Sequence, residues 1–149
     1  MILDTTNTFA TAEDISAAAG TALIGDVIDL SATPGDIGAG QKMHLVIEVT
    51  TTFTSGGSAI VQFVLASDAQ AVITVDGSET RHALSDAFAF GDLVAGTRII
   101  IPLPSGYPNY ERYLGVLAIT SGATTTAGSI NAHLALDTQN WKAYPDAVN

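Results

Sequence analysis

The sequence has no cysteine, and this absence excludes several kinds of chemistry at once. Disulfides, thiol nucleophiles and cysteine-ligated zinc sites all require the missing side chain. The fold must therefore be held by packing and hydrogen bonds, which is compatible with folding in a reducing cytosol.

Basic residues are also scarce. The 149 residues include five Lys and Arg against fifteen Asp and Glu, so the formal net charge is −10 at pH 7. Binding to a phosphate backbone needs clustered basic side chains, and those of this chain are scattered. We therefore expect no nucleic-acid partner, and the negative charge also disfavours anionic membrane surfaces. The five basic residues are Lys42, Arg81, Arg98, Arg112 and Lys142.

Long apolar runs are missing as well. No stretch approaches the roughly 18 apolar residues of a membrane-spanning helix, so we expect no membrane association. The first residues have neither a basic region nor a long apolar stretch after them, so we expect no signal peptide. Charged residues make up 13% of the chain, about half the usual share. This composition is typical of tightly associating β-proteins; a small β-domain from an acidic proteome is the alternative.

The sequence shows no catalytic or metal-binding motif. None of the histidines, His44, His82 and His133, has a second histidine at a spacing typical of metal ligands, so each is interpreted as a surface or interface residue. No GxSxG nucleophile elbow is present. The glycine-rich stretch 35–40 leads into a predicted strand, whereas a dinucleotide site needs a helix there. We therefore expect no enzyme activity, no cofactor and no metal.

Alternation of apolar with other residues dominates the chain from Val27 onward and indicates β-strands. These stretches are rich in β-branched and aromatic residues, and glycine-containing turns separate them. The pattern predicts a single all-β domain, a jelly-roll-like antiparallel β-sandwich of about eight strands. The stronger strands are expected over 43–49, 60–66, 97–103 and 130–137, and the weaker ones over 27–30, 72–75, 82–90 and 113–120.

Both ends of the chain are predicted to lie outside the sandwich. In the stretch 11–25, Thr11 and Asp14 loosely match a helix-capping pattern and a run of alanines follows, but the apolar residues form a poor helical stripe. We expect an N-terminal arm over about 1–25 that is either extended or a short helix. Residues from about 140 to 149 are expected to form a C-terminal tail.

Two of the predicted strands are apolar on both faces. Ile60 and Val64 alternate with a second apolar row in 60–66, and Ile100 does the same in 97–103. A strand of a simple sandwich normally has one polar face. Two explanations fit: loops cover the outer face of a central strand, or a neighbouring subunit covers it.

A group of aromatic residues is the best candidate for a recognition site. Tyr107 and Tyr110 lie close to Arg112 in the sequence, and aromatic residues and arginine are enriched at protein interfaces. The tyrosines could instead pack over the end of the sandwich, or stack on a carbohydrate. Trp141 could hold the tail to the body or anchor a neighbour. Tyr107, Tyr110, Arg112 and Trp141 are therefore the predicted interface residues.

Short segments along nearly the whole chain resemble a known protein family in their order and spacing. These segments are 1–4 with Phe9, 27–30, 36–41, 44–49, 93–96, 103–104, 112–116, 126–128 and 136–139. On them the chain resembles the jelly-roll cement, or decoration, proteins of tailed phages, such as the one from a Bordetella podovirus.

The resemblance implies a structural virion protein without catalytic residues. Such a protein is made in the cytoplasm of the bacterial host and binds the outer surface of a capsid. Its partner is a major capsid protein of the HK97 type, and it stabilises contacts between capsomers. Self-association as a homodimer or homotrimer is expected. Two alternatives stay open: a carbohydrate-binding jelly roll, and another virion appendage domain from a head fibre or tail.

Overall fold

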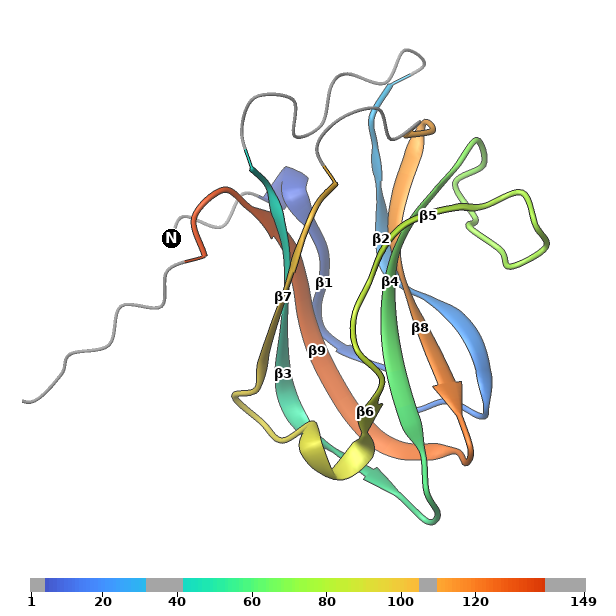
Figure 1. The fold of residues 1–149 in the computed structure, drawn as a ribbon, viewed down its shortest axis with the longest axis vertical. Helices are drawn as coiled ribbons and strands as arrows, with labels where there is room; N and C mark the ends of the chain where they lie inside the picture. The colour runs from blue at the N-terminus through green and yellow to red at the C-terminus, as the bar shows by residue number, and fades with distance from the viewer. Residues whose placement is uncertain (1–4, 32–41, 105–109, 139–149) are drawn as a thin grey trace, which may run out of the picture.

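The computed structural model describes residues 5–31, 42–104 and 110–138. Two antiparallel sheets face each other (Figure 1). The four-stranded sheet has the order β1 (Thr8–Asp14), β9 (Thr125–Ala135), β3 (His44–Ser55) and β7 (Arg98–Pro102). The five-stranded sheet has the order β2 (Gly20–Asp29), β8 (Tyr113–Ser121), β4 (Ile60–Asp68) and β5 (Thr80–Leu84), with β6 (Phe88–Ala89) paired to the start of β4. Short 3₁₀ helices, η1 (Thr5–Asn7) and η2 (Phe90–Asp92), precede β1 and β7.

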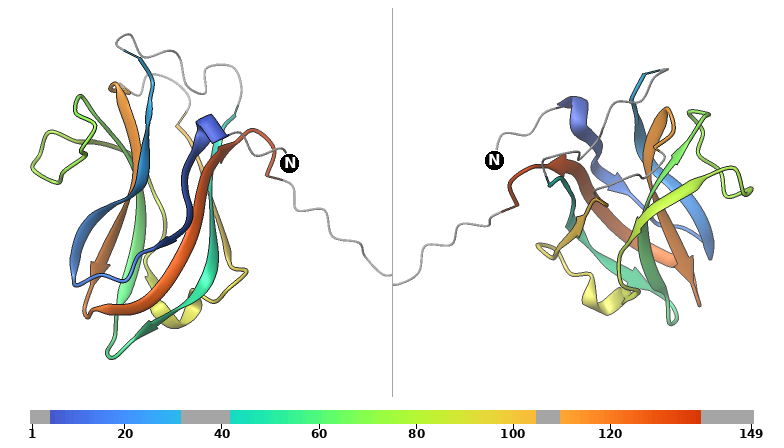
Figure 2. Two further views of the ribbon diagram at one scale, coloured as in Figure 1. Left: turned by 180° about the vertical axis from the view of Figure 1, so that it is seen from behind. Right: turned by 45° about the horizontal axis from the view of Figure 1, so that its top comes forward.

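The path of the chain between the sheets makes the sandwich a jelly roll. Strands β1 to β4 fall alternately in the four-stranded and the five-stranded sheet, and β7 to β9 alternate in the same way. Only β4, β5 and β6 follow one another within one sheet. The views in Figure 2 show the connections crossing between the two layers at their ends. This is the double Greek-key arrangement of jelly rolls, so the predicted fold class is confirmed.

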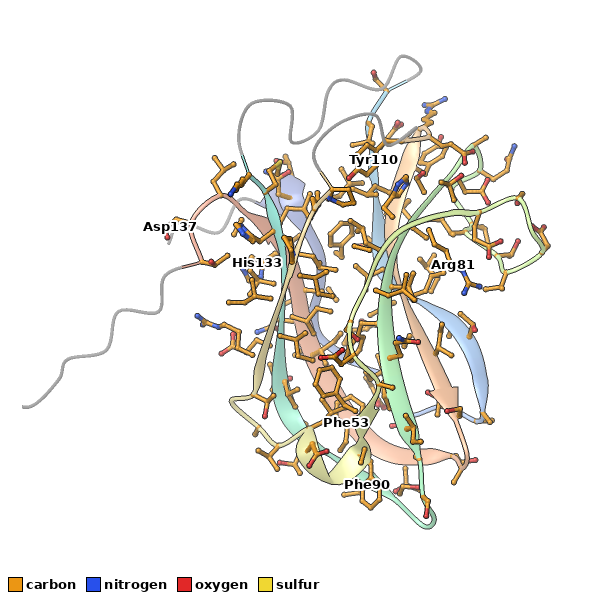
Figure 3. The ribbon with its side chains drawn as sticks, viewed as in Figure 1. Phe53, Arg81, Phe90, Tyr110, His133 and Asp137 are labelled. Atoms are coloured by element: carbon orange, nitrogen blue, oxygen red, sulfur yellow. The ribbon has the colours of Figure 1, made fainter. Side chains whose placement is uncertain are left out.

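The core lies between the sheets and contains the inward-facing residues of the central strands. Because side chains of a strand alternate between its faces, one apolar row of each central strand reaches the core. Leu45 and Ile47 of β3 face Phe63 and Leu65 of β4, and all four are fully buried. Burying one such side chain contributes about 1.5–3 kcal/mol. Figure 3 shows the side chains filling the space between the layers.

The expected N-terminal arm is wrong for the described part of that segment. Residues 8–14 and 20–29 form β1 and β2, which are edge strands of the two sheets. The alternation is hidden in the sequence because both strands are irregular. β1 has register shifts against β9, with Ala12 at φ 50°, and β2 has one between Ile24 and Ile28. Bulges of this kind break the period of two on which the prediction rests.

Two of the weaker predicted strands also need correction. Residues 72–75 form no strand and lie in the loop between β4 and β5. The stretch 82–90 is divided among β5, β6 and the start of η2. The remaining predicted strands are confirmed, mostly at greater length than expected. The predicted C-terminal tail, 140–149, lies outside the described residues.

The loop between β4 and β5 explains why β4 is apolar on both faces. Its Ile73 packs on the outer face of the five-stranded sheet, over Val64 and Leu117, and all three are buried. Cover by a loop, the first of the two explanations, is therefore confirmed for Val64. Ile100 on the outer face of the four-stranded sheet is different, since 41% of its surface stays exposed.

Gly25 is required where the two bulged edge strands meet. Its φ is +58°, and a Cβ at this position would lie 2.2 Å from the backbone oxygen of Phe9. A Gly25→Ala substitution should therefore force the edge strands apart and lower the free energy of unfolding by about 3 kcal/mol or more. Chemical denaturation measures this loss.

Gly96→Ala is the matched control for that variant. Gly96 also has a positive φ, +90°, but no atom lies within 4 Å of its built Cβ. In the control, only the backbone strain of an alanine at positive φ should lower the free energy of unfolding, by about 1 kcal/mol. Equal losses in the two variants would show that the close approach of β1 and β2 is not a constraint.

Candidate interaction surfaces

Tyr110 and Arg112, two of the predicted interface residues, lie at one end of the sandwich beside β8. The ring of Tyr110, which is labelled in Figure 3, stacks on that of His82 from β5, with 4.1 Å between the ring centroids. The hydroxyl of Tyr110 is buried without a hydrogen-bond partner among the described residues. Burial raises the pKa of Tyr110. These contacts support the alternative in which a tyrosine packs over the end of the sandwich.

A buried serine and a half-buried histidine hold the same end of the sandwich together. Ser67 Oγ lies 2.7 Å from His82 Nε2 and accepts the backbone N–H of Glu111 at 3.0 Å. The Glu111 carboxylate in turn accepts a hydrogen bond from Thr80 Oγ1 at 2.7 Å. Ser67 is fully buried, so its hydroxyl ties β4 and β5 to the chain entering β8 and does not face solvent.

Arg112 also has partners within the chain. Its Nε and Nη2 donate to the two oxygens of Asp29 in β2 at 3.0 and 2.9 Å, and its guanidinium lies 4.9 Å from the ring centroid of Tyr113. These hydrogen bonds lower the pKa of Asp29. The ion pair links β2 to the start of β8 and leaves part of the guanidinium exposed. Tyr107 and Trp141 lie outside the described residues, so their roles stay predictions.

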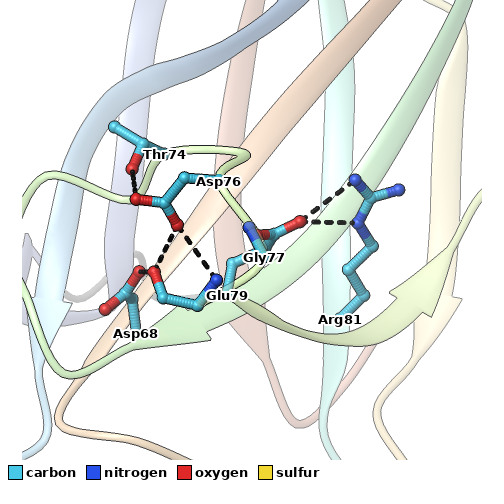
Figure 4. A network of polar contacts seen from close by, with 7 residues as sticks. Asp68, Thr74, Asp76, Gly77, Glu79 and Arg81 are labelled. Carbon is cyan, nitrogen blue, oxygen red and sulfur yellow. Dashed lines mark hydrogen bonds and ion pairs between the residues drawn. The ribbon is translucent and has the colours of Figure 1, made fainter.

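Hydrogen bonds hold the loop between β4 and β5 in place (Figure 4). Asp68 and Asp76 both accept from the hydroxyl of Ser78, at 3.0 and 2.6 Å. Glu79 accepts the N–H of Gly77 and pairs with Arg81 at 3.1 Å. The side-chain hydrogen bond from Ser78 lowers the pKa of Asp76. The loop is therefore anchored where it carries Ile73 over the sheet.

The outer face of the five-stranded sheet carries further apolar residues outside the area that this loop covers. Leu84, Val64, Leu117 and Leu23 form one row across β5, β4, β8 and β2. The ends of the row are accessible, with Leu84 51% exposed. Val72 at the tip of the loop is 69% exposed. We call this surface, made of the row with Val72, Val75 and Ile60, the apolar face.

His133 occupies a position that the sequence prediction described only in part. It lies on the outer face of the four-stranded sheet, as predicted, but exposes only 4% of its surface, and its Nε2 has no partner among the described residues. Burial, followed by the charge of Arg98, lowers its pKa, and Glu48 opposes this shift. A buried polar atom normally has a partner. The burial of His133 could not be predicted from the sequence, because the residues opposite it, Thr8 and Val46, come from other strands.

A groove runs over the bulged edge of the sandwich beside His133. It has a volume of about 700 Å³. Its walls come from β1, β2, β3 and β9, whose segments are far apart in the sequence. We call it the edge groove, and its lining residues are Thr8, Phe9, Ala10, Thr11, Glu13, Gly25, Asp26, Glu48, Asn131 and His133.

The described residues form neither a candidate metal site nor a candidate membrane-spanning helix. No group of three or more His, Asp or Glu side chains there is placed to hold a metal ion. No helix in the same part of the chain has the length and hydropathy needed to cross a membrane.

Comparison with known proteins identifies the family. The sequence matches the Bbp16 family over residues 9–134, which is most of the chain and nearly the whole sandwich. The chain belongs to the Bbp16 family. This is a family of Bordetella phage proteins, so the resemblance to phage proteins is confirmed at that level. No curated protein matches the sequence.

The stability of this Bbp16-family jelly roll should fall in mild acid because of His82. Burial lowers the pKa of His82, although the charge of Glu111 opposes the shift. The unfolded chain therefore takes up the proton first as the pH falls below about 6.5, the ordinary histidine value, and stability decreases there. His133 acts in the same direction. We expect a lower thermal midpoint at about pH 5.5 than at about pH 7.5.

The variant His82→Gln tests the assignment of this effect. Glutamine keeps a hydrogen-bonding group near Ser67 but does not titrate, so the dependence on pH should become shallower in this range. The carboxylates with lowered pKa, such as Asp29 and Asp76, lose their contribution only in more acidic solution, below about pH 4. An unchanged slope in His82→Gln would contradict the assignment.

Proposed function

We propose that this Bbp16-family protein is a capsid cement protein. It binds the outer surface of a shell built from an HK97-type major capsid protein and stabilises the contacts between capsomers. In this proposal it is a structural component of the virion and carries no catalytic site. It is made in the host cytoplasm and joins the particle there.

The observation that carries the proposal is the apolar face on a rigid jelly roll from a phage family. Exposed apolar residues scattered singly are ordinary on protein surfaces. Here Leu84 and Leu23 end a continuous apolar row whose middle is buried beneath Ile73. Val72, Val75 and Ile60 stay exposed around this covered row, at 69%, 46% and 41%. Exposed apolar side chains gathered on one face are typical of an interaction site. The net charge of −10 keeps the free protein soluble until it meets its partner.

A capsid shell has many equivalent binding sites for such a protein. Subunit seams are the weak points of a pressurised shell, and a small domain that touches two capsomers adds contact area across a seam. Symmetry repeats this contact over the particle. If the protein is also a homodimer or homotrimer, its subunits can bind the shell at the same time, and the overall affinity is then far higher than that of a single subunit.

The contacts of Tyr110 weaken the carbohydrate alternative at this residue. A tyrosine that stacks on a sugar must present its ring face, but Tyr110 is stacked on His82 and its hydroxyl is buried. Tyr107 and Trp141 remain predicted contact residues of the cement protein.

Co-sedimentation with empty phage shells tests the proposal. The protein should pellet saturably and in a fixed ratio to the capsid protein, while unrelated acidic proteins stay in the supernatant. A Leu84→Asn variant should bind about fivefold more weakly, because Leu84 is half-exposed on the apolar face and burying its side chain contributes on the order of 1 kcal/mol.

Val94→Asn is the matched control. Val94 is exposed to a similar extent, 48%, but lies in the turn before β7, away from the apolar face. This control should bind as the unmodified protein does. A correctly folded protein that stays in the supernatant with every shell would contradict the proposal, and equal losses in the two variants would remove the apolar face from it.

A further inference from the structure

The edge groove combines negative charge with an unsatisfied polar atom. Glu13, Asp26 and Glu48 line it, and its lining contains no lysine or arginine. Glu13 and Asp26 are exposed, and no hydrogen bond or ion pair engages their carboxylates among the described residues. Arg98 approaches Glu48 only to 4.0 Å from the neighbouring strand. At least two negative charges in the groove therefore lack a counter-charge within the described part of the chain.

His133 supplies the second and independent observation. It lines the groove, exposes 4% of its surface, and its Nε2 has no hydrogen-bond partner among the described residues. Burial, followed by the charge of nearby Arg98, favours the neutral imidazole by lowering the pKa of His133, and Glu48 opposes this shift. A neutral imidazole has one nitrogen that accepts a hydrogen bond. A ligand that brings N–H donors and positive charge would satisfy His133 and the carboxylates together.

The shape of the groove argues for a side chain of another protein as this ligand. The described residues offer no metal-binding group, and about 700 Å³ is far more space than a bare ion fills. Addition of a regular strand to β1 is hindered, because its register against β9 shifts twice and Ala12 has a positive φ. Bulges of this kind disrupt strand pairing at an edge. Recognition would therefore depend on side-chain charge more than on backbone hydrogen bonds.

We propose that the edge groove binds an arginine-bearing segment of the partner protein, with the guanidinium held by Glu13 and Asp26 and next to His133. The planar guanidinium has five N–H donors in a fixed fork, so it can bond to a carboxylate and a second acceptor at once. The inference rests on the proposed function, because it takes the capsid protein to be the source of that segment.

Binding of a model peptide tests the groove without any capsid. The probe is a short fluorescein-labelled peptide in which arginine alternates with threonine, and its affinity for the full-length protein is measured by fluorescence polarisation. The same peptide with citrulline in place of arginine keeps the shape and removes the charge. The arginine peptide should bind saturably, and the citrulline peptide should bind at least about tenfold more weakly.

Two double variants with the same change in net charge separate the groove from general attraction. Glu13→Gln with Asp26→Asn removes two groove carboxylates and should weaken peptide binding about tenfold. Asp86→Asn with Asp92→Asn removes two exposed carboxylates near β5 and η2, at the opposite edges of the sheets. This control should bind the peptide nearly as the unmodified protein does. Equal weakening in both double variants, or equal binding of the two peptides, would overturn the inference.

Pelleting of the same variants with empty shells distinguishes the inference from the proposed function. If the unmodified protein pellets and the Glu13→Gln, Asp26→Asn variant does so less, both stand. If the two pellet equally, the cement function stands and the groove is not its contact. If the unmodified protein does not pellet, the cement function fails, and the peptide measurement alone decides whether the groove binds arginine.

Discussion

The packing of two apolar sheet faces against each other is the interaction on which the rest of this structure depends. The chain has no disulfide. Of the ion pairs within the described residues, Arg98–Glu48 and Arg112–Asp29 are partly exposed on both sides, and Arg81–Glu79 joins a partly exposed guanidinium to a carboxylate side chain that is 6% exposed. Exposed ion pairs contribute little to stability. The inward rows of β3, β4, β8 and β9 therefore supply most of the stabilising free energy. The apolar face and the edge groove both lie on the outside of this scaffold.

The outer faces of the two sheets differ in a way that follows from the loops. The loop between β4 and β5 is held by Asp68, Asp76 and Ser78 and lays Ile73 over one sheet, leaving a rim of exposed apolar residues. The other sheet carries His133, Glu13 and Glu48 near its bulged edge. In the proposed cement function, which bridges two capsomers, the two sheets would offer one apolar and one acidic contact surface.

The sequence was enough to predict the class of the fold and its regular strands, and not its irregular ones. In β3 and β9 a buried row alternates with a more exposed one, so their pattern is visible. β1 and the first part of β2 escaped prediction because bulges beside Phe9, Ala12 and Gly25 interrupt that pattern, and only the end of β2, within 27–30, was expected. The stretch 72–75 has strand-like composition because Ile73 covers a sheet, which is a tertiary role that alternation cannot reveal.

The candidate sites were less accessible to sequence reasoning than the fold. Tyr110 and Arg112 stand out in the sequence as an aromatic residue close to an arginine, but the partners that they contact, His82 and Asp29, come from distant strands. The edge groove joins β1, β2, β3 and β9, and its unpaired His133 becomes evident only once their register is known. Strand pairing over long sequence separations was the missing information.

A cryo-electron-microscopy reconstruction of the phage particle tests the proposed cement function, because it locates the protein on the virion. We expect density for the jelly roll on the outer surface of the head, across the seams between capsomers. Density confined to the tail or to a head fibre, or a mature head without this protein, would contradict it.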